Sequence, residues 1–292
     1  NLTNSETQVS GFRSQVSYSY DSLNRLHSVL DPHTGLTAYN YDNVGNLQDF
    51  ILPNGVNQVY DYDTLNRLTN LAVNSLTTPI ESYRYTLGPS GHRLAAQEGN
   101  GRQVTYQYDN LYRLTKERIL GASPLGDISY GFDPVGNRLA MTSTVFGIPS
   151  QVNTFDANDR LGSDTYDAAG NTKAGTIHDS LDGTDTAFTY SYDSENRILA
   201  ATSAVSAVQL LYDGDGNRVG KTVTDSFGTR TTRYLVDDRN PTGYSQVLRE
   251  SSSSSSSSSE VFYACGLDVI SQQRTENGEP RTAFYGYDGH GN

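Results

Sequence analysis

The chain has 292 residues, enough for one large domain or two ordinary ones, and a formal net charge of −12. Leu, Ile, Val and Phe supply only 62 residues, so the 21 tyrosines must provide much of the buried surface, and a thick aliphatic core is excluded. The excess of acidic residues makes nucleic acids and anionic membranes poor partners and favours a basic guest. A single cysteine excludes an intrachain disulfide, and no apolar run is long enough to span a membrane.

A pattern of two aromatic residues and an aspartate recurs from the beginning of the chain to its end. The pattern Tyr-x-Tyr-Asp, followed by an Arg and then Leu or Ile, begins at Tyr18, Tyr60, Tyr106 and Tyr190. Looser copies begin at Tyr39, Tyr83, Tyr130, Thr154, Thr165, Leu211 and Tyr285. Successive second aromatics from Tyr20 to Phe155 are 21 to 24 residues apart. Such a fixed period is typical of a repeat protein.

Each aromatic pair predicts a β-strand with both rings on one side, because side chains alternate between the two faces of a strand. The pairs are Tyr18 and Tyr20, Tyr39 and Tyr41, Tyr60 and Tyr62, Tyr106 and Tyr108, Tyr190 and Tyr192, and Tyr285 and Tyr287, with Phe132 and Tyr212 as second rings of looser copies. An aspartate follows each second ring, where its carboxylate can accept the amide N–H two residues on and begin a turn.

The turn aspartates are Asp21, Asp42, Asp63, Asp109, Asp133, Asp193, Asp213 and Asp288. In four turns an arginine follows at the fourth position and is expected to face the aspartate: Arg25, Arg67, Arg113 and Arg197. In two others, Arg138 and Arg218 follow at the fifth position with an added glycine, which predicts a glycine bulge or a longer hairpin loop.

A second strand and a loop with Gly or Pro, as at residues 31–35 and 52–55, complete each unit. Each unit is therefore a β-hairpin of about 22 residues, whereas a propeller blade needs about 40–45. The sequence predicts an all-β fold of tandem hairpins that form one long antiparallel sheet.

Two segments lack the repeat pattern. Residues 171–187 have no clear aromatic pair and are predicted to form a longer loop. Residues 251–259 are nine serines, which predict either a flexible linker or a stand-in for chain whose side chains were not assigned. This divides the chain into a repeat array over 1–250, the serine run over 251–259 and the last repeats over 260–292.

No residues are arranged as a catalytic or metal site. The histidines are scattered at His27, His33, His92, His178 and His290. We therefore expect no metal and no other cofactor. The segment that starts at Asp213 begins like a calcium loop, but Arg218 stands where such a loop needs Gly, so a turn of the repeat is favoured. Cys265 is predicted to be a small buried thiol.

The recurring Asp and Arg pairs also favour a structural role, because an active site occurs once and these pairs occur in most units. Rows of tyrosines could bind sugars, although cross-strand ring packing is the favoured interpretation.

The repeats resemble the YD-repeat, or RHS-repeat, family over most of residues 12–292. The segments YLVDDRNPTGYSQVLRE from Tyr234, GLDVISQQR from Gly266 and FYGYDGHGN from Phe284 are similar to the lead-in to the RHS-associated core of bacterial polymorphic toxins. Similar arrays occur in toxin-complex C subunits and in teneurins. The resemblance implies a strip of β-hairpins that curves or spirals into a hollow shell around a C-terminal toxin, released by aspartyl self-cleavage. We expect the self-cleaving core and the toxin to lie beyond Asn292, so no catalytic residue is carried over.

The leading hypothesis is a non-enzymatic segment of such a shell in a secreted or surface-exposed bacterial protein. Its expected partners are the C-terminal toxin or effector of the same polypeptide, or other copies of the repeat. Twelve hairpins at about 4.8 Å per strand make a sheet of roughly 115 Å, too short to enclose a toxin of about 130 residues, which predicts part of a wall. The alternatives are an adhesion module that binds glycans or a cell surface, and a self-associating extracellular filament.

Overall fold

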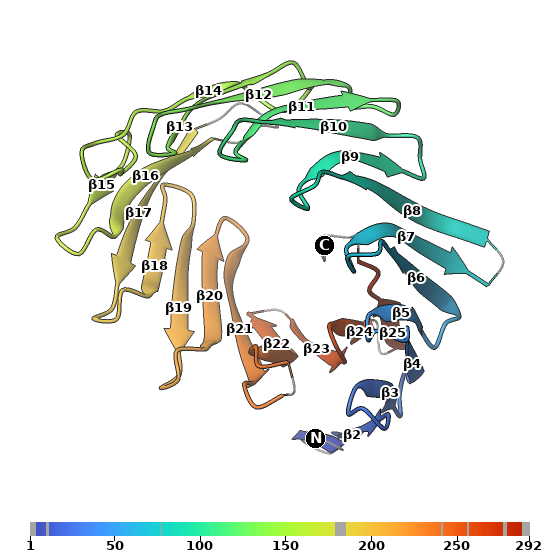
Figure 1. Cartoon of the computed structure of the whole chain (residues 1–292). Helices are drawn as coiled ribbons and strands as arrows, with labels where there is room; N and C mark the ends of the chain where they lie inside the picture. Colours follow the sequence, from blue (N-terminus) through green and yellow to red (C-terminus); the bar gives the residue numbers. More distant parts are fainter. Residues whose placement is uncertain are drawn as a thin grey trace. The chain divides into compact units, whose positions relative to one another are not determined.

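The computed structural model describes residues 4–9, 12–76, 78–178, 185–240, 242–255, 257–276 and 279–287. This part of the chain is all β, and it contains no helix that could cross a membrane. Within each sheet, the strands are hydrogen-bonded to their neighbours in chain order, as the colours of Figure 1 show. The predicted all-β fold of stacked antiparallel hairpins is confirmed.

The first sheet contains 14 strands among the described residues. They are β1 (Asn4–Val9), β2 (Phe12–Tyr20), β3 (Leu26–Asp31), β4 (Gly35–Tyr41), β5 (Leu47–Ile51), β6 (Val56–Tyr62), β7 (Leu68–Ser75), β8 (Thr78–Leu87), β9 (Arg93–Glu98), β10 (Gln103–Tyr108), β11 (Leu114–Leu120), β12 (Gly126–Phe132), β13 (Arg138–Ser143) and β14 (Gln151–Val152).

The second sheet contains 11 strands among the described residues. They are β15 (Thr165–Tyr166), β16 (Thr172–His178), β17 (Asp185–Tyr192), β18 (Ile198–Thr202), β19 (Ala207–Tyr212), β20 (Arg218–Asp225), β21 (Gly228–Asp237), β22 (Gln246–Ser254), β23 (Ser258–Cys265), β24 (Val269–Glu276) and β25 (Glu279–Phe284).

The ladder is interrupted between β14 and β15. Here two turns begin at Asp156 and Asp167, only 11 residues apart, so the chain between them is too short for a full pair of strands. A single bridge between Phe155 and Leu161 remains. The repeat is thus locally shortened where one sheet ends and the next begins.

A β-bulge recurs at the second ring of the hairpins. Ser19 pairs with Ser28 but Tyr20 pairs with Leu26, which leaves His27 as the extra residue. The same shift occurs at the second ring of other repeats: Tyr41, Tyr62, Tyr108, Phe132 and Tyr192. Bulges increase the local twist of a strand pair, so each repeat bends the sheet in the same way.

The chain divides into two compact units, one of residues 1–83, 212–221 and 230–292 and the other of residues 84–211 and 222–229. In the first unit, early and late repeats share one core of seven buried residues. The core residues are Leu26, Val29, Tyr39, Phe50, Leu52, Ala264 and Ile270. The second unit has a core of Val104, Ile119, Ile128, Met141 and Val145, with Tyr106 and Tyr130 packed against it. Packed tyrosines therefore extend both small cores, as the composition required.

The two segments without aromatic pairs also form strands. Thr172 to His178 is β16 and Asp185 begins β17, so the loop predicted over 171–187 is wrong for these residues; 179–184 lie outside the described residues. Ser251 to Ser254 lie in β22, where Ser252 pairs with Ser259 of β23. Backbone hydrogen bonds do not depend on the side chain, so a serine run can join a sheet that its neighbours have already formed.

Candidate functional site: the repeating Tyr-Asp turns

One aspartate organises each turn. Asp21 Oδ1 accepts the backbone N–H groups of Leu23 and Arg25, both at 2.9 Å, and its Oδ2 accepts Arg25 Nε at 2.7 Å. The backbone N–H of Asp21 donates to the carbonyl of Arg25 at 2.9 Å. Between them Asn24 has a φ of 61°, a left-handed conformation that asparagine tolerates well. The carboxylate thus satisfies the amides of a tight turn.

This geometry occurs in nine turns of the described residues. The turn aspartates are Asp21, Asp42, Asp63, Asp109, Asp133, Asp156, Asp167, Asp193 and Asp213. For Asp21, the backbone N–H of Arg25 is the main cause that lowers the pKa of the carboxyl; desolvation opposes it and the guanidinium adds to it. The pKa of the other eight carboxyls is also lowered, because their hydrogen bonds outweigh a desolvation that raises it.

The turns have one length and two endings, which corrects the prediction of a longer loop. In the turn that begins at Asp133, Gly136 takes the left-handed position with a φ of 109°, and Asn137 Nδ2 donates to Asp133 Oδ2 at 2.8 Å. Asn137 therefore stands where Arg25 stands in the first turn. Arg138 is the first residue of the next strand, and its guanidinium lies 6.0 Å from the centre of the Tyr130 ring.

The glycine in these turns is not an insertion. Turns with an arginine at the fourth position have a non-glycine residue before it, and turns with an asparagine there have a glycine before it. The asparagines are Asn46, Asn137, Asn171 and Asn217. Sequence reasoning missed them because the units were aligned on the arginine; alignment on the aspartate would have found them.

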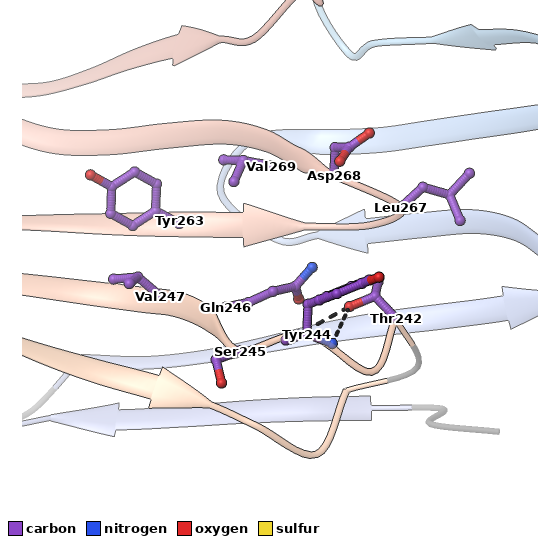
Figure 2. A pocket seen from close by; sticks show the side chains of 9 residues that line it. All are labelled: Thr242, Tyr244, Ser245, Gln246, Val247, Tyr263, Leu267, Asp268 and Val269. Atoms are coloured by element: carbon purple, nitrogen blue, oxygen red, sulfur yellow. Dashed lines mark hydrogen bonds between the residues drawn. The ribbon is translucent and has the colours of Figure 1, made fainter. Parts of the chain in front are cut away.

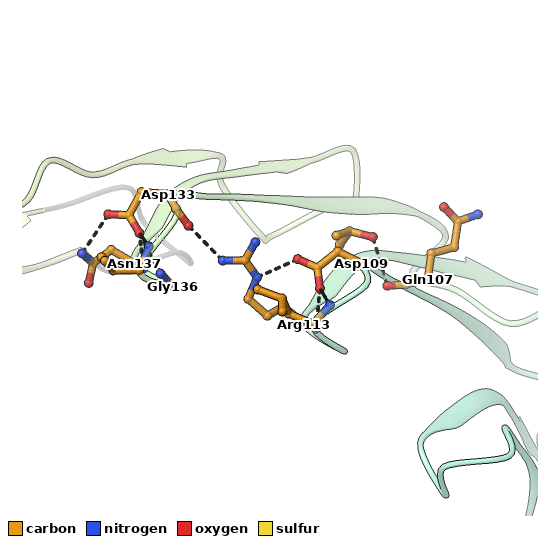
Figure 3. A network of polar contacts seen from close by, with 9 residues as sticks. Gln107, Asp109, Arg113, Asp133, Gly136 and Asn137 are labelled. Atoms are coloured by element: carbon orange, nitrogen blue, oxygen red, sulfur yellow. Dashed lines mark hydrogen bonds and ion pairs between the residues drawn. The ribbon is translucent and has the colours of Figure 1, made fainter.

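Neighbouring turns are hydrogen-bonded to one another. Figure 3 shows Arg113, which donates from Nε to Asp109 Oδ2 at 2.6 Å and from Nη1 to the carbonyl oxygen of Asp133 at 2.9 Å. Where the ending is asparagine, the link is between side chains: Asn46 Nδ2 donates to Asn66 Oδ1 at 3.1 Å. Equivalent bonds join Asn137 to Asp159 and Asn171 to Asn196. The residue that closes one turn thus also holds the next.

The second tyrosine of each pair reaches back to the preceding hairpin. The hydroxyl of Tyr41 donates to the carbonyl of Leu26 at 2.8 Å, and that of Tyr62 donates to Leu47 at 2.9 Å. Both carbonyls belong to the first residue of the strand that follows the preceding turn. The same contact is made by Tyr108, Tyr192 and Tyr287, and Tyr166 donates to the carbonyl of Leu161, the first residue after the Asp156 turn. Sequence reasoning gave these hydroxyls no partner.

The arginines also contact the second ring of the following repeat. The Arg25 guanidinium lies 4.4 Å from the centre of the Tyr41 ring, and that of Arg113 lies 5.0 Å from the Phe132 ring. Arg25 therefore joins its own aspartate to the next unit, as a planar guanidinium can do by bonding at its edge and stacking on its face.

The first tyrosines build the cores. The Tyr39 ring is 3% exposed and lies 5.6 Å from the Phe50 ring, which is 6.3 Å from the Tyr60 ring. Residues between paired rings, such as Ser19 and Gln107, are exposed whereas the rings are at least half-buried, so both rings of a pair lie on one face. In the last repeat the rings of Tyr285 and Tyr287 stack at 6.4 Å. This burial leaves the paired rings little free surface for a sugar.

The remaining predicted residues lie in the same framework. Arg67 and Arg197 bond their own aspartates, Asp63 and Asp193, like Arg25. Tyr18 packs against the first core, Tyr106 packs against the second, and Tyr190 stacks on Phe188 at 6.3 Å. Tyr212 ends β19 before the Asp213 turn, and Arg218 begins β20, 5.4 Å from the Tyr234 ring. Asp288 lies outside the described residues.

The residues considered for chemistry do not converge. No three His, Cys, Asp or Glu side chains form a metal-binding group within the described ranges. The calcium-like segment is a turn of the repeat, in which Asp213 Oδ1 accepts the N–H groups of Asp215 and Asn217. Cys265 is 3% exposed, and burial raises the pKa of its thiol to about 12. The recurring function of the site residues is to join one hairpin to the next.

Known proteins with this architecture were found by sequence and by structure. Residues 2–143 match the family model described as the teneurin YD-shell. No curated protein sequence matches the chain. A chain in the crystal structure of TcdB2-TccC3 is similar, with a TM-score of 0.62, 15% identity, and coverage of 93% of this chain and 17% of that chain. A chain in the structure of TcdB2-TccC3-Cdc42 gives a TM-score of 0.60, 14% identity, and coverage of 94% and 17%. At 14% and 15% identity, these similarities show a shared fold alone. This chain spans 17% of the length of those two chains.

Proposed function

The chain belongs to the RHS/YD-repeat family, and we propose that it is a non-enzymatic segment of a shell wall that encapsulates or presents a C-terminal toxin or effector of the same polypeptide. The parent would be a secreted or surface-exposed bacterial protein. A single observation carries this proposal: the side chains that recur in the repeats bond to the neighbouring repeat, as when the hydroxyl of Tyr62 donates to the carbonyl of Leu47.

The contacts support a wall because each repeat is bonded to the next one along the chain. A hairpin alone is at best marginally stable, whereas a row of hairpins gains stability from each interface between neighbours. Asp109, Arg113 and Asp133 form such an interface through side-chain and backbone hydrogen bonds. Their polar groups are occupied by the fold, and their recurrence favours a structural role over a catalytic one.

The length and charge of the chain fit a wall segment. It covers 17% of the length of the similar chains, and as a wall segment it would need further repeats to complete the proposed enclosure. A formal charge of −12 favours a basic or partly unfolded guest over a nucleic acid.

Protease protection in the full-length parent tests this function. The domain that follows the repeats should resist a protease concentration that degrades the same domain expressed alone. Alanine at Asp63 and Asp109 together should remove this protection, because two turns lose their central acceptor. Replacement of Asp61 and Asp215, two exposed aspartates outside this role, is the matched control. Equal protease sensitivity with and without the repeats would contradict encapsulation.

A further inference from the structure

The connection between β21 and β22 is longer than the repeating turn. Asp237 accepts the N–H of Arg239 at 2.9 Å, as other turn aspartates do. The chain, however, returns only at Gln246, which pairs with Asp237, so eight residues lie between the paired ones. In the first turn five residues, 21–25, separate Tyr20 from its partner Leu26. The added residues are not needed to close a hairpin, and such loops often carry binding residues.

Internal hydrogen bonds fix this loop. Asn240 Nδ2 donates to the carbonyls of Asp237 at 3.0 Å and of Tyr244 at 2.6 Å. Ser245 Oγ contacts Asn217 Oδ1, in the preceding turn, at 2.6 Å. The Tyr244 ring is nevertheless 80% exposed, so the loop holds a large aromatic side chain in solvent. Single exposed rings are common on protein surfaces, so the exposure of Tyr244 has meaning only together with the pocket that it lines.

A pocket of about 420 Å³ lies between this loop and strands β23 and β24, within the first unit. Figure 2 shows Tyr244 and Gln246 on one side of it and Tyr263 and Asp268 on the other. The volume falls in the range of small-ligand pockets, about 300–1,000 Å³. Among the described residues that line the pocket there is no lysine, arginine or histidine.

The lining provides an anionic and aromatic site. Among the described residues, the Asp268 carboxylate has no hydrogen-bond or ion-pair partner, and neither the Gln246 amide nor the Tyr244 hydroxyl has one. The charge of Asp268 is felt by its neighbours: after burial, it is the second cause that raises the pKa of Tyr287 to about 12. Within the described ranges, the pocket thus combines a carboxylate without an ion-pair partner, an amide without a hydrogen bond and an exposed aromatic ring.

We propose that this pocket binds the guanidinium group of an arginine side chain from a peptide or protein partner. A guanidinium bonds a carboxylate through two parallel N–H groups and stacks on an aromatic ring, which matches Asp268 and Tyr244. The Gln246 carbonyl oxygen can accept a further N–H. A neutral sugar could also contact Tyr244, but it would desolvate the Asp268 carboxylate without neutralising it. The site is additional to the wall function and does not depend on it.

Calorimetric titration of the intact chain with N-acetyl-arginine amide tests the proposal. N-acetyl-citrulline amide is the matched ligand control, because it is nearly isosteric and uncharged. The arginine derivative should bind at least about tenfold more tightly than the citrulline derivative, because citrulline lacks the charge of the guanidinium and loses a charge-assisted hydrogen bond. Equal binding of the two ligands would overturn the proposal.

Two variants locate the site. Asp268→Asn should weaken binding about tenfold, and Tyr244→Leu should weaken it about threefold through loss of the cation–π contact. Asp238→Asn makes the same charge change in the loop that carries Tyr244, outside the pocket, and should leave binding within twofold. Circular dichroism checks that each variant is folded. An affinity that Asp268→Asn leaves unchanged, or a glucose titration that shows tighter binding than arginine and depends on Tyr244, would refute the assignment.

Discussion

The hydroxyl of the second tyrosine should stabilise the junction between repeats, and Tyr62→Phe isolates that contribution. The substitution removes the 2.9 Å hydrogen bond to the carbonyl of Leu47 and keeps the ring. Phenylalanine occurs naturally at this repeat position as Phe132, so the backbone accepts it without rearrangement. A hydrogen bond of this kind contributes about 0.5–1.5 kcal/mol net, and we expect the free energy of unfolding to fall by about 1 kcal/mol.

Urea denaturation followed by circular dichroism measures this loss, with the midpoint lowered and the slope unchanged. Tyr244→Phe is the matched control, because that side chain is 80% exposed and its hydroxyl has no partner among the described residues. Its effect should stay within about 0.5 kcal/mol. If Tyr62→Phe and Tyr244→Phe have the same stability, the hydroxyl does not hold the junction.

Four further outcomes are expected. Gly136→Ala should cost about 1–2 kcal/mol in thermal or urea unfolding, because a φ of 109° strains an L-residue even in open space, while Gly214→Ala, without a positive φ, should be neutral. Leu71→Ala should cost about 2–5 kcal/mol at a side chain with 0% exposure, whereas Leu65→Ala, at 67%, should cost under about 0.5 kcal/mol; similar losses would contradict the burial of Leu71. The nine turn carboxyls have folded pKa values below the unfolded value of about 3.9, so the free energy of unfolding should be constant near neutral pH and fall as the pH drops through those folded values. An acid titration in which stability is already lost near pH 6 would refute this. Cys265, buried and with its pKa raised to about 12, should react with iodoacetamide at pH 8 only after denaturation, and rapid labelling of the native chain would contradict its burial.

The turn aspartates could be identified from sequence because their interactions are local. Asp21 bonds groups two and four residues away, so a short motif contains both partners. The two turn endings were misassigned for a local reason as well: Arg138 was aligned with Arg25 although Asn137 occupies the equivalent position. Alignment by residue type failed where two different side chains, guanidinium and amide, perform the same capping role.

By itself the sequence determined the period, the strand at each aromatic pair and the common face of its two rings, because these follow from the alternation of side chains along one strand. Only the tertiary structure decided that Tyr62 bonds the carbonyl of Leu47, that Tyr39 packs in one core with Ala264, and that Tyr244 and Asp268 line one pocket. Those contacts join residues 15 to 225 positions apart. Their partners are backbone carbonyls and side chains that no motif marks, so the stacking and packing of the hairpins had to be known first.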